Sequence, residues 1–261
     1  MRRSINTLIV TSILFLCLLS LSAVGGFIGE ALYFLAFAIP IAFGLIFSAK
    51  SADAGRVEVR KERILPSLAL FAPTLLLIIA ISAVTSYLLA LLGKSSSTDV
   101  SGNLAIELLR HALLPAVLEE LLFRFIPLKL LGERSPRAFI LVSSLLFALI
   151  HLNLFQIPYA ILAGGVFAFL ALATGSIIPS ILLHLANNAL SVIWMRNPDL
   201  TVPIVIVGTV LSVLSLVYIF IRRREYSSWI REALSGERIG YCPELVATTV
   251  ALIAAAIFNL R

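Results

Sequence analysis

The chain has 261 residues, of which 60% are hydrophobic and only 13% are charged, and its mean hydropathy is +1.06. Soluble domains average about 45–50% apolar and about 25% charged residues. Because a domain of this length must still present a surface to water, this composition excludes an ordinary soluble protein. The net charge of +6 accompanies no basic helix or aromatic-basic motif, so we expect no nucleic-acid partner and interpret the basic residues as loop charges.

Long apolar stretches, each with the roughly 20 residues that span a bilayer, occur along the whole chain. They predict an all-α, polytopic transmembrane bundle of about eight to nine helices, forming a single integral membrane domain over residues 1–261. Arg2 and Arg3 give the first stretch the look of a signal peptide, but we expect it to be retained. The stretches are 5–24, 30–49, 65–92, 104–128, 138–154, 157–174, 176–195 and 202–221, with 244–260 as a ninth candidate.

The basic residues predict the orientation of this bundle, because Lys and Arg gather in cytoplasmic loops. If the N-terminus is cytoplasmic, 15 of the 20 basic residues fall in inner segments, whereas the outer segments hold Lys94, Arg196 and Arg261. We therefore expect a multi-pass membrane protein with a cytoplasmic N-terminus, and an outer C-terminus if the last stretch spans. The inner basic residues are Arg2, Arg3, Lys50, Arg56, Arg60, Lys61, Arg63, Lys129, Arg134, Arg137, Arg222, Arg223, Arg224, Arg231 and Arg238.

The fourth stretch carries the densest set of charges in any apolar segment, namely Glu119, Glu120 and Arg124. An ionisable residue near the bilayer centre costs about 2.5–3.5 kcal/mol, so each one indicates a functional role by default. Glu120 and Arg124 are four residues apart, which predicts an ion pair across one helical turn and leaves Glu119 unpaired. Pro115 and Pro127 flank the motif and predict that the helix kinks or opens on either side of it.

Two later stretches carry polar residues at one-turn spacing. Phe147 precedes His151 by four residues, and His184 precedes Asn188 by four, with Asn187 beside it. A single His or Asn in a span usually makes one interhelical hydrogen bond of about 0.6–2 kcal/mol, so each alone favours a structural role. Their joint occurrence with an unpaired glutamate favours a polar site inside the bundle.

The depths of these residues can be compared at about 1.5 Å per residue. Glu119 lies about 15 Å from Lys129 and His184 about 14 Å from Gly175. His151 lies about 21 Å from Arg137. His151 is therefore expected to be deeper, unless its helix starts below the interface or tilts. Other residues are assigned structural roles: His111, Trp194, Tyr226 and Trp229 at the interfaces, and Gly164 and Gly165 in close helix packing.

The sequences EELLFR, FALIH and HLANN, in this order on three stretches, resemble the motifs EExxxR, FxxxH and HxxxN of the CPBP intramembrane protease family. This family includes the type II CAAX prenyl endopeptidases and the bacteriocin-immunity proteins called Abi. The resemblance covers residues 110–195, which we expect to form the catalytic core. It implies that Glu119 is a general base that activates water with help from His151, and that His184 and Asn188 donate hydrogen bonds to the oxyanion.

The resemblance gives Glu120 and Arg124 a supporting role, in which each positions the other, and Phe147 is interpreted as packing beside His151. Zinc is the alternative chemistry, because two histidines and two glutamates are available as ligands. The sequence has no HExxH, and an arginine beside a divalent metal is unfavourable. We therefore expect no cofactor and no metal, with zinc as the less favoured alternative.

The function implied is that of an intramembrane endopeptidase acting on a peptide or protein in the lipid bilayer, with CAAX-type C-terminal processing of a prenylated protein as one form. The alternative is a non-proteolytic membrane scaffold or bacteriocin-immunity protein that uses the same polar cluster. A transporter is a weaker hypothesis, because no second half of the chain mirrors the motif-bearing stretches.

Overall fold

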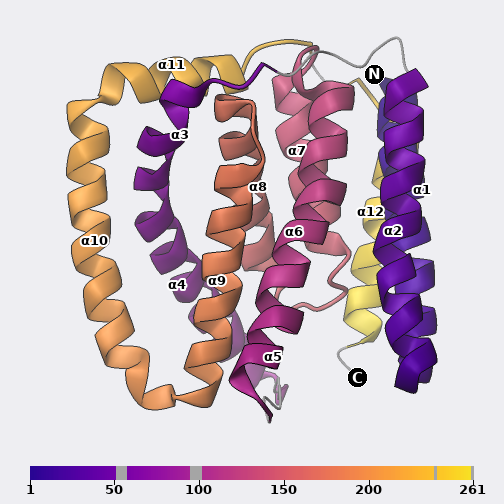
Figure 1. The fold of residues 1–261 in the computed structure, drawn as a ribbon, viewed down its shortest axis with the longest axis horizontal. Coiled ribbons are helices and arrows are strands. Elements are labelled where there is room, and N and C mark those ends of the chain that lie inside the picture. Colours follow the sequence, from indigo (N-terminus) through magenta and orange to yellow (C-terminus); the bar gives the residue numbers. More distant parts are fainter. Residues whose placement is uncertain (51–57, 95–101, 238–239, 260–261) are drawn as a thin grey trace.

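A computed structural model describes residues 1–50, 58–94, 102–237 and 240–259, and the regular elements in these ranges are helices that run side by side as a bundle (Figure 1). The predicted all-α, polytopic fold is confirmed. Six helices of the described chain are long and apolar enough to cross a membrane: Arg2–Val24, Ile28–Lys50, Lys61–Leu91, Ile157–Thr174, Ile178–Arg196 and Pro198–Ile221.

Every predicted apolar stretch contains helix. In chain order the elements are α1 (Arg2–Leu21), η1 (Ser22–Val24), α2 (Gly26–Lys50), α3 (Lys61–Ser67), η2 (Leu68–Leu70), α4 (Phe71–Leu91), α5 (Leu104–Leu108), η3 (Leu109–Leu113), α6 (Leu114–Glu120), η4 (Leu121–Phe125), η5 (Leu128–Gly132), α7 (Pro136–Leu149), α8 (Ile157–Thr174), α9 (Ile178–Arg196), η6 (Pro198–Leu200), α10 (Thr201–Ile221), α11 (Arg223–Ala233) and α12 (Pro243–Phe258).

The elements α5 to η5 follow one another as a single helical path that includes three π-helical turns, η3, η4 and η5. The helix opening expected beside Pro115 and Pro127 is thus present as π-helical turns. Pro127 has no N–H to offer the carbonyl of Phe123, and the hydroxyl of Ser143 on α7 donates to that carbonyl instead. A neighbouring helix thus satisfies the backbone group that the proline frees, as membrane interiors require.

The helix α7 ends five residues earlier than predicted, at Leu149, so His151 lies in the connection to α8. Leu152 adopts a left-handed conformation with φ of 47°, which ends the helix. The side chain of Asn153 then accepts a hydrogen bond from the N–H of Phe155 at 2.9 Å, and Asn259 donates to the carbonyl of Leu152 at 3.2 Å. His151 therefore lies just beyond the end of α7, and its depth in the membrane stays a prediction.

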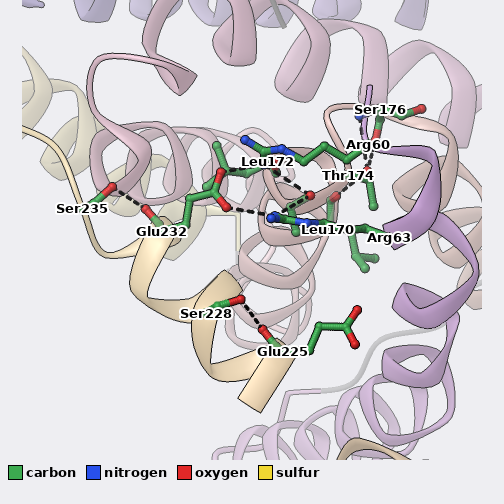
Figure 2. Close-up of polar contacts among 11 residues, drawn as sticks. Arg60, Arg63, Leu170, Leu172, Thr174, Ser176, Glu225, Ser228, Glu232 and Ser235 are labelled. Carbon is green, nitrogen blue, oxygen red and sulfur yellow. Dashed lines mark hydrogen bonds and ion pairs between the residues drawn. The ribbon is translucent and has the colours of Figure 1, made fainter. Parts of the chain in front are cut away.

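One end of the bundle, which we call the basic end, holds the N-terminus, α3, α11 and the connections 132–136 and 174–178 (Figure 1). Glu232 on α11 forms ion pairs with Arg60 and Arg63 (Figure 2). The Arg63 guanidinium also donates to the carbonyl of Ala173 at 3.1 Å, and the backbone N–H of Arg60 donates to the carbonyl of Thr174 at 2.8 Å. These cations satisfy the carbonyls at the C-terminus of α8 and hold α3 and α11 across this end.

The helix α11 was not predicted, and its aromatic residues correct an expectation. Tyr226 and Trp229 are only 4% and 2% exposed, so they pack against the bundle instead of anchoring the chain in lipid. The Tyr226 hydroxyl donates to the carbonyl of Pro66 at 2.6 Å, and burial raises the pKa of Tyr226 to about 12. Trp194, near the other end of the bundle, donates to the Thr201 hydroxyl at 2.7 Å.

The opposite end of the bundle holds η1, the start of α5 and η6 (Figure 1). The helices α1 and α2 form a hairpin whose buried residues belong to the same core as α7 and α8. A Cβ added at Gly44 of α2 would lie 2.6 Å from the Ile126 side chain. The α1–α2 hairpin therefore packs closely against the central helices towards the basic end.

Candidate functional site

The three motif-bearing helical segments meet in the interior of the bundle. Glu119 and Glu120 end α6, Arg124 follows in η4, and His184 and Asn188 lie one turn apart on α9. Phe147 and His151, which complete the predicted set, come from the end of α7 and the turn after it. The packing of α7 on α8, of α8 on α9 and of α6 on α9 brings these segments together.

Glu120, Arg124 and His184 form a buried charged cluster. The Glu120 and Arg124 side chains are 0% exposed, and Arg124 Nη1 lies 3.1 Å from Glu120 Oε1, so the predicted ion pair is present. His184 Nδ1 lies 3.0 Å from the same carboxylate oxygen and donates to it, because an ionised carboxylate only accepts. Arg124 Nη2 donates to the carbonyl of Gly164 at 3.3 Å.

Two phenylalanines enclose this cluster. The guanidinium carbon of Arg124 lies 4.1 Å from the ring centroid of Phe147 and 5.3 Å from that of Phe167. The ring of His184 stacks on Phe167 at 5.0 Å, and Phe147 presents its ring to His151 at 5.1 Å. Phe147 therefore packs beside His151 as predicted. The rings of Phe147 and Phe167 also provide cation–π stabilisation of the buried Arg124. Phe167 was not predicted, since its helix is apolar all round.

Gly164 allows α8 to approach this cluster. A Cβ at that position would lie 3.1 Å from both Phe147 Cδ1 and Ser144 Cα, and 3.2 Å from Arg124 Nη2. Such contacts are tighter than side chains normally tolerate, so the close-packing role predicted for Gly164 is confirmed. A Cβ at Gly165 would meet only the Ser144 hydroxyl, at 3.7 Å, which is ordinary contact.

The tautomer of neutral His151 follows from its hydrogen bond. Its Nδ1 atom lies 2.8 Å from the carbonyl oxygen of Phe147. A carbonyl only accepts, so Nδ1 carries the proton, and Nε2 of the neutral ring retains its lone pair. The imidazole is thus fixed in the tautomer that can accept a proton or a hydrogen bond at Nε2.

Glu119 faces a cavity of about 870 Å³, together with His151 and Asn188. Its side chain is 14% exposed, and its Oε2 atom has no hydrogen-bond partner. His184 Nε2 lies 3.8 Å from that atom, which is within ion-pair range but too long for a hydrogen bond. Asn187, which also lines the cavity, donates to Asn188 Oδ1 at 3.1 Å.

Two tyrosines, Tyr33 of α2 and Tyr159 of α8, also line this cavity, and neither was predicted. His111, predicted to be interfacial, lies at the cavity wall near the opposite end of the bundle. Its ring is largely exposed, and its Nε2 lies 3.2 Å from the carboxylate of Glu107.

Within the described ranges, no three His, Cys, Asp or Glu side chains are grouped as ligands of a metal ion. Of the four residues considered for zinc, Glu120 and His184 are already bonded to each other, and Arg124 lies against Glu120. A divalent cation at that carboxylate would be repelled by the guanidinium. The donor set therefore does not favour the zinc alternative.

Residues 101–190 match the family model described as type II CAAX prenyl endopeptidase Rce1-like. No curated protein and no solved structure gives a significant match to the chain. The matched residues include all three motifs and overlap most of the predicted core at 110–195. The resemblance expected from EELLFR, FALIH and HLANN is thereby confirmed: residues 101–190 of the chain are similar to the type II CAAX prenyl endopeptidases.

Proposed function

We propose that this chain is an intramembrane endopeptidase in which Glu119 activates a water molecule for attack on a peptide bond. The observation that carries the proposal is a division of roles between two adjacent carboxylates, which have different surroundings. Glu120 is fully buried and paired with Arg124, whereas Glu119 lines a cavity and has one oxygen, Oε2, that is buried without a hydrogen-bond partner. The Rce1-like match supports a protease, and this division supports Glu119 as its base.

In the first step, Glu119 takes a proton from a water molecule as the water oxygen bonds to the peptide carbonyl carbon. His151 lines the same cavity, and its Nε2 lone pair is available to accept a hydrogen bond from that water. The two groups thereby orient the water as well as activate it, which adds positioning to base catalysis. The carbonyl oxygen acquires the negative charge.

Hydrogen-bond donors placed where charge develops are usually the largest contribution to catalysis of this kind. Asn188 lines the cavity, and its amide can donate to the oxyanion. His184 donates from Nδ1 to Glu120, and its Nε2 lies 3.8 Å from Glu119, so donation from Nε2 to the oxyanion requires that both ring nitrogens carry a proton. The carbon–nitrogen bond then breaks as Glu119 returns its proton to the leaving amine.

In this mechanism Glu120 and Arg124 are positioning residues. Glu120 fixes the ring of His184 through a 3.0 Å bond, and Arg124 balances the charge of Glu120 at 3.1 Å. The guanidinium is itself held by the carbonyl of Gly164 and by two aromatic rings. We further propose that the basic end is cytoplasmic, because most basic residues of the chain lie in its segments.

The proposal is tested by comparing peptide termini in membranes of cells that produce the wild type, Glu119→Gln or Glu107→Gln. Glu107 lies on the same helical path but beside His111, away from the buried cluster, so its variant is a matched control. A set of termini present with the wild type and Glu107→Gln, but absent with Glu119→Gln, is expected. Termini that are unchanged by Glu119→Gln would favour the scaffold or immunity alternative.

A further inference from the structure

The cavity at Glu119 lies on one side of the site. On the path from α5 to α6 its lining runs from Ile106 to Glu119 and no further towards the basic end. On α9 its lining residues lie between Asn187 and Met195, beyond His184 in the direction of the opposite end. The lining of α2 comes from the half of that helix that begins at Gly26.

The other side of the site is closed. From Glu120 towards the basic end, most side chains from η4 to η5 are buried, as are neighbouring side chains of α7 and α8, and none of these residues lines the cavity. They include Phe123, Ile126, Leu130, Leu131, Phe139 and Leu170. Above them, α3 and α11 lie across the end of α8 and are held there by Glu232 and its arginines (Figure 2). Access to Glu119 is therefore from the opposite end.

We infer that the site receives its peptide from the extracytoplasmic side of the membrane. The inference rests on the proposed function and combines two independent observations, the closed basic end and the excess of Lys and Arg on that end. The substrate class it names is a peptide segment displayed on the extracytoplasmic face. A prenylated C-terminus in the cytoplasm would meet the closed end instead.

The length of the cavity constrains the form of that peptide. Ile106 and Glu119 are 13 residues apart, which corresponds to roughly 20 Å of helix. At about 3.3 Å per residue, a strand-like peptide of on the order of six residues covers this distance. The walls include apolar side chains, among them Phe34, Leu109, Leu114 and Val192. The site thus suits an extended segment that carries apolar residues, since a folded domain does not fit.

Accessibility of single cysteines tests the side of access without any need for activity. In a Cys17→Ser background, which retains the buried Cys242, intact cells are treated with a membrane-impermeant maleimide. Ser191→Cys reports the cavity, Asp199→Cys the opposite end and Arg224→Cys the basic end. Labelling of Ser191→Cys and Asp199→Cys in intact cells, with Arg224→Cys labelled only after permeabilisation, is expected. Labelling of Ser191→Cys only after permeabilisation would overturn the inference.

A second experiment measures cleavage by the same cysteine variants. Treatment of intact cells with the impermeant maleimide is expected to stop the formation of the Glu119-dependent termini in Ser191→Cys and to leave it unchanged in Asp199→Cys. Those termini should map to extracytoplasmic segments, and termini that map to cytoplasmic segments would contradict the inference. If no terminus depends on Glu119, the proposed function fails, while the labelling result still decides which side the cavity faces.

Discussion

Replacement of Glu120 by glutamine tests whether the buried ion pair supports the fold. The variant keeps the shape of the side chain and an oxygen that accepts from His184, but it removes the charge opposite Arg124. Because both side chains are 0% exposed and 3.1 Å apart, the buried guanidinium loses the carboxylate with which it is paired. Loss of one partner of such a pair costs about 3–5 kcal/mol, so we expect a destabilisation of that size.

A double variant separates the charge effect from packing. Glu120→Gln combined with Arg124→Met removes both charges and leaves an apolar side chain between Phe147 and Phe167. We expect the double variant to be more stable than the sum of the single changes predicts, by about 2 kcal/mol. The matched control is Glu119→Gln, whose side chain has no cationic atom nearer than 3.8 Å and should change stability by less than about 1 kcal/mol.

Unfolding in detergent can be followed through the reactivity of the buried Cys242 in a Cys17→Ser background. Denaturant midpoints and m-values of the wild type, Glu120→Gln, Arg124→Met and the double variant then give the coupling free energy. A loss of less than about 1 kcal/mol in Glu120→Gln, or simple additivity in the double variant, would refute the idea that charge balance holds this cluster.

Three further outcomes are expected. Ser143→Ala leaves the carbonyl of Phe123 without its donor and should lower the stability by about 1–2 kcal/mol in thermal unfolding, whereas Ser144→Ala, which loses only a bond within its own helix, should not. Gly164→Ala should reduce the cleavage rate about tenfold by displacing Phe147 or Arg124, whereas Gly165→Ala should retain the wild-type rate. Exhaustive chelation followed by metal-free dialysis should leave cleavage unchanged, and activity that returns only with added zinc would support the metal alternative.

Much of the site was predictable because charge is expensive in a membrane span. Glu120 and Arg124 at one-turn spacing predicted the ion pair that the structure contains, and the leftover Glu119 lies at the cavity. The bond between His184 and Glu120 was not predicted, since it joins residues 64 positions apart. Spacing along one helix reveals partners on that helix, but not the rotation of its neighbours.

Residues in uniformly apolar helices gave no such signal. Phe167, Tyr33 and Tyr159 lie in spans without a polar face, so nothing in the pattern distinguishes them from residues that face lipid. The predicted end of this helix, at residue 154, was later than the observed end of α7 at Leu149 for a related reason. Leu152 and Leu154 continue the apolar run, while the turn depends on the conformation of Leu152 and on a contact from Asn259.

The central claim is that Glu119 is the base of a peptide-bond hydrolysis. Its most direct test is the rate at which the purified protein cleaves a peptide identified from the Glu119-dependent termini. Glu119→Gln should reduce this rate by about 10²–10⁴-fold, while its unfolding midpoint stays within the error of the wild type. Cleavage by a folded Glu119→Gln variant at the wild-type rate would contradict the account.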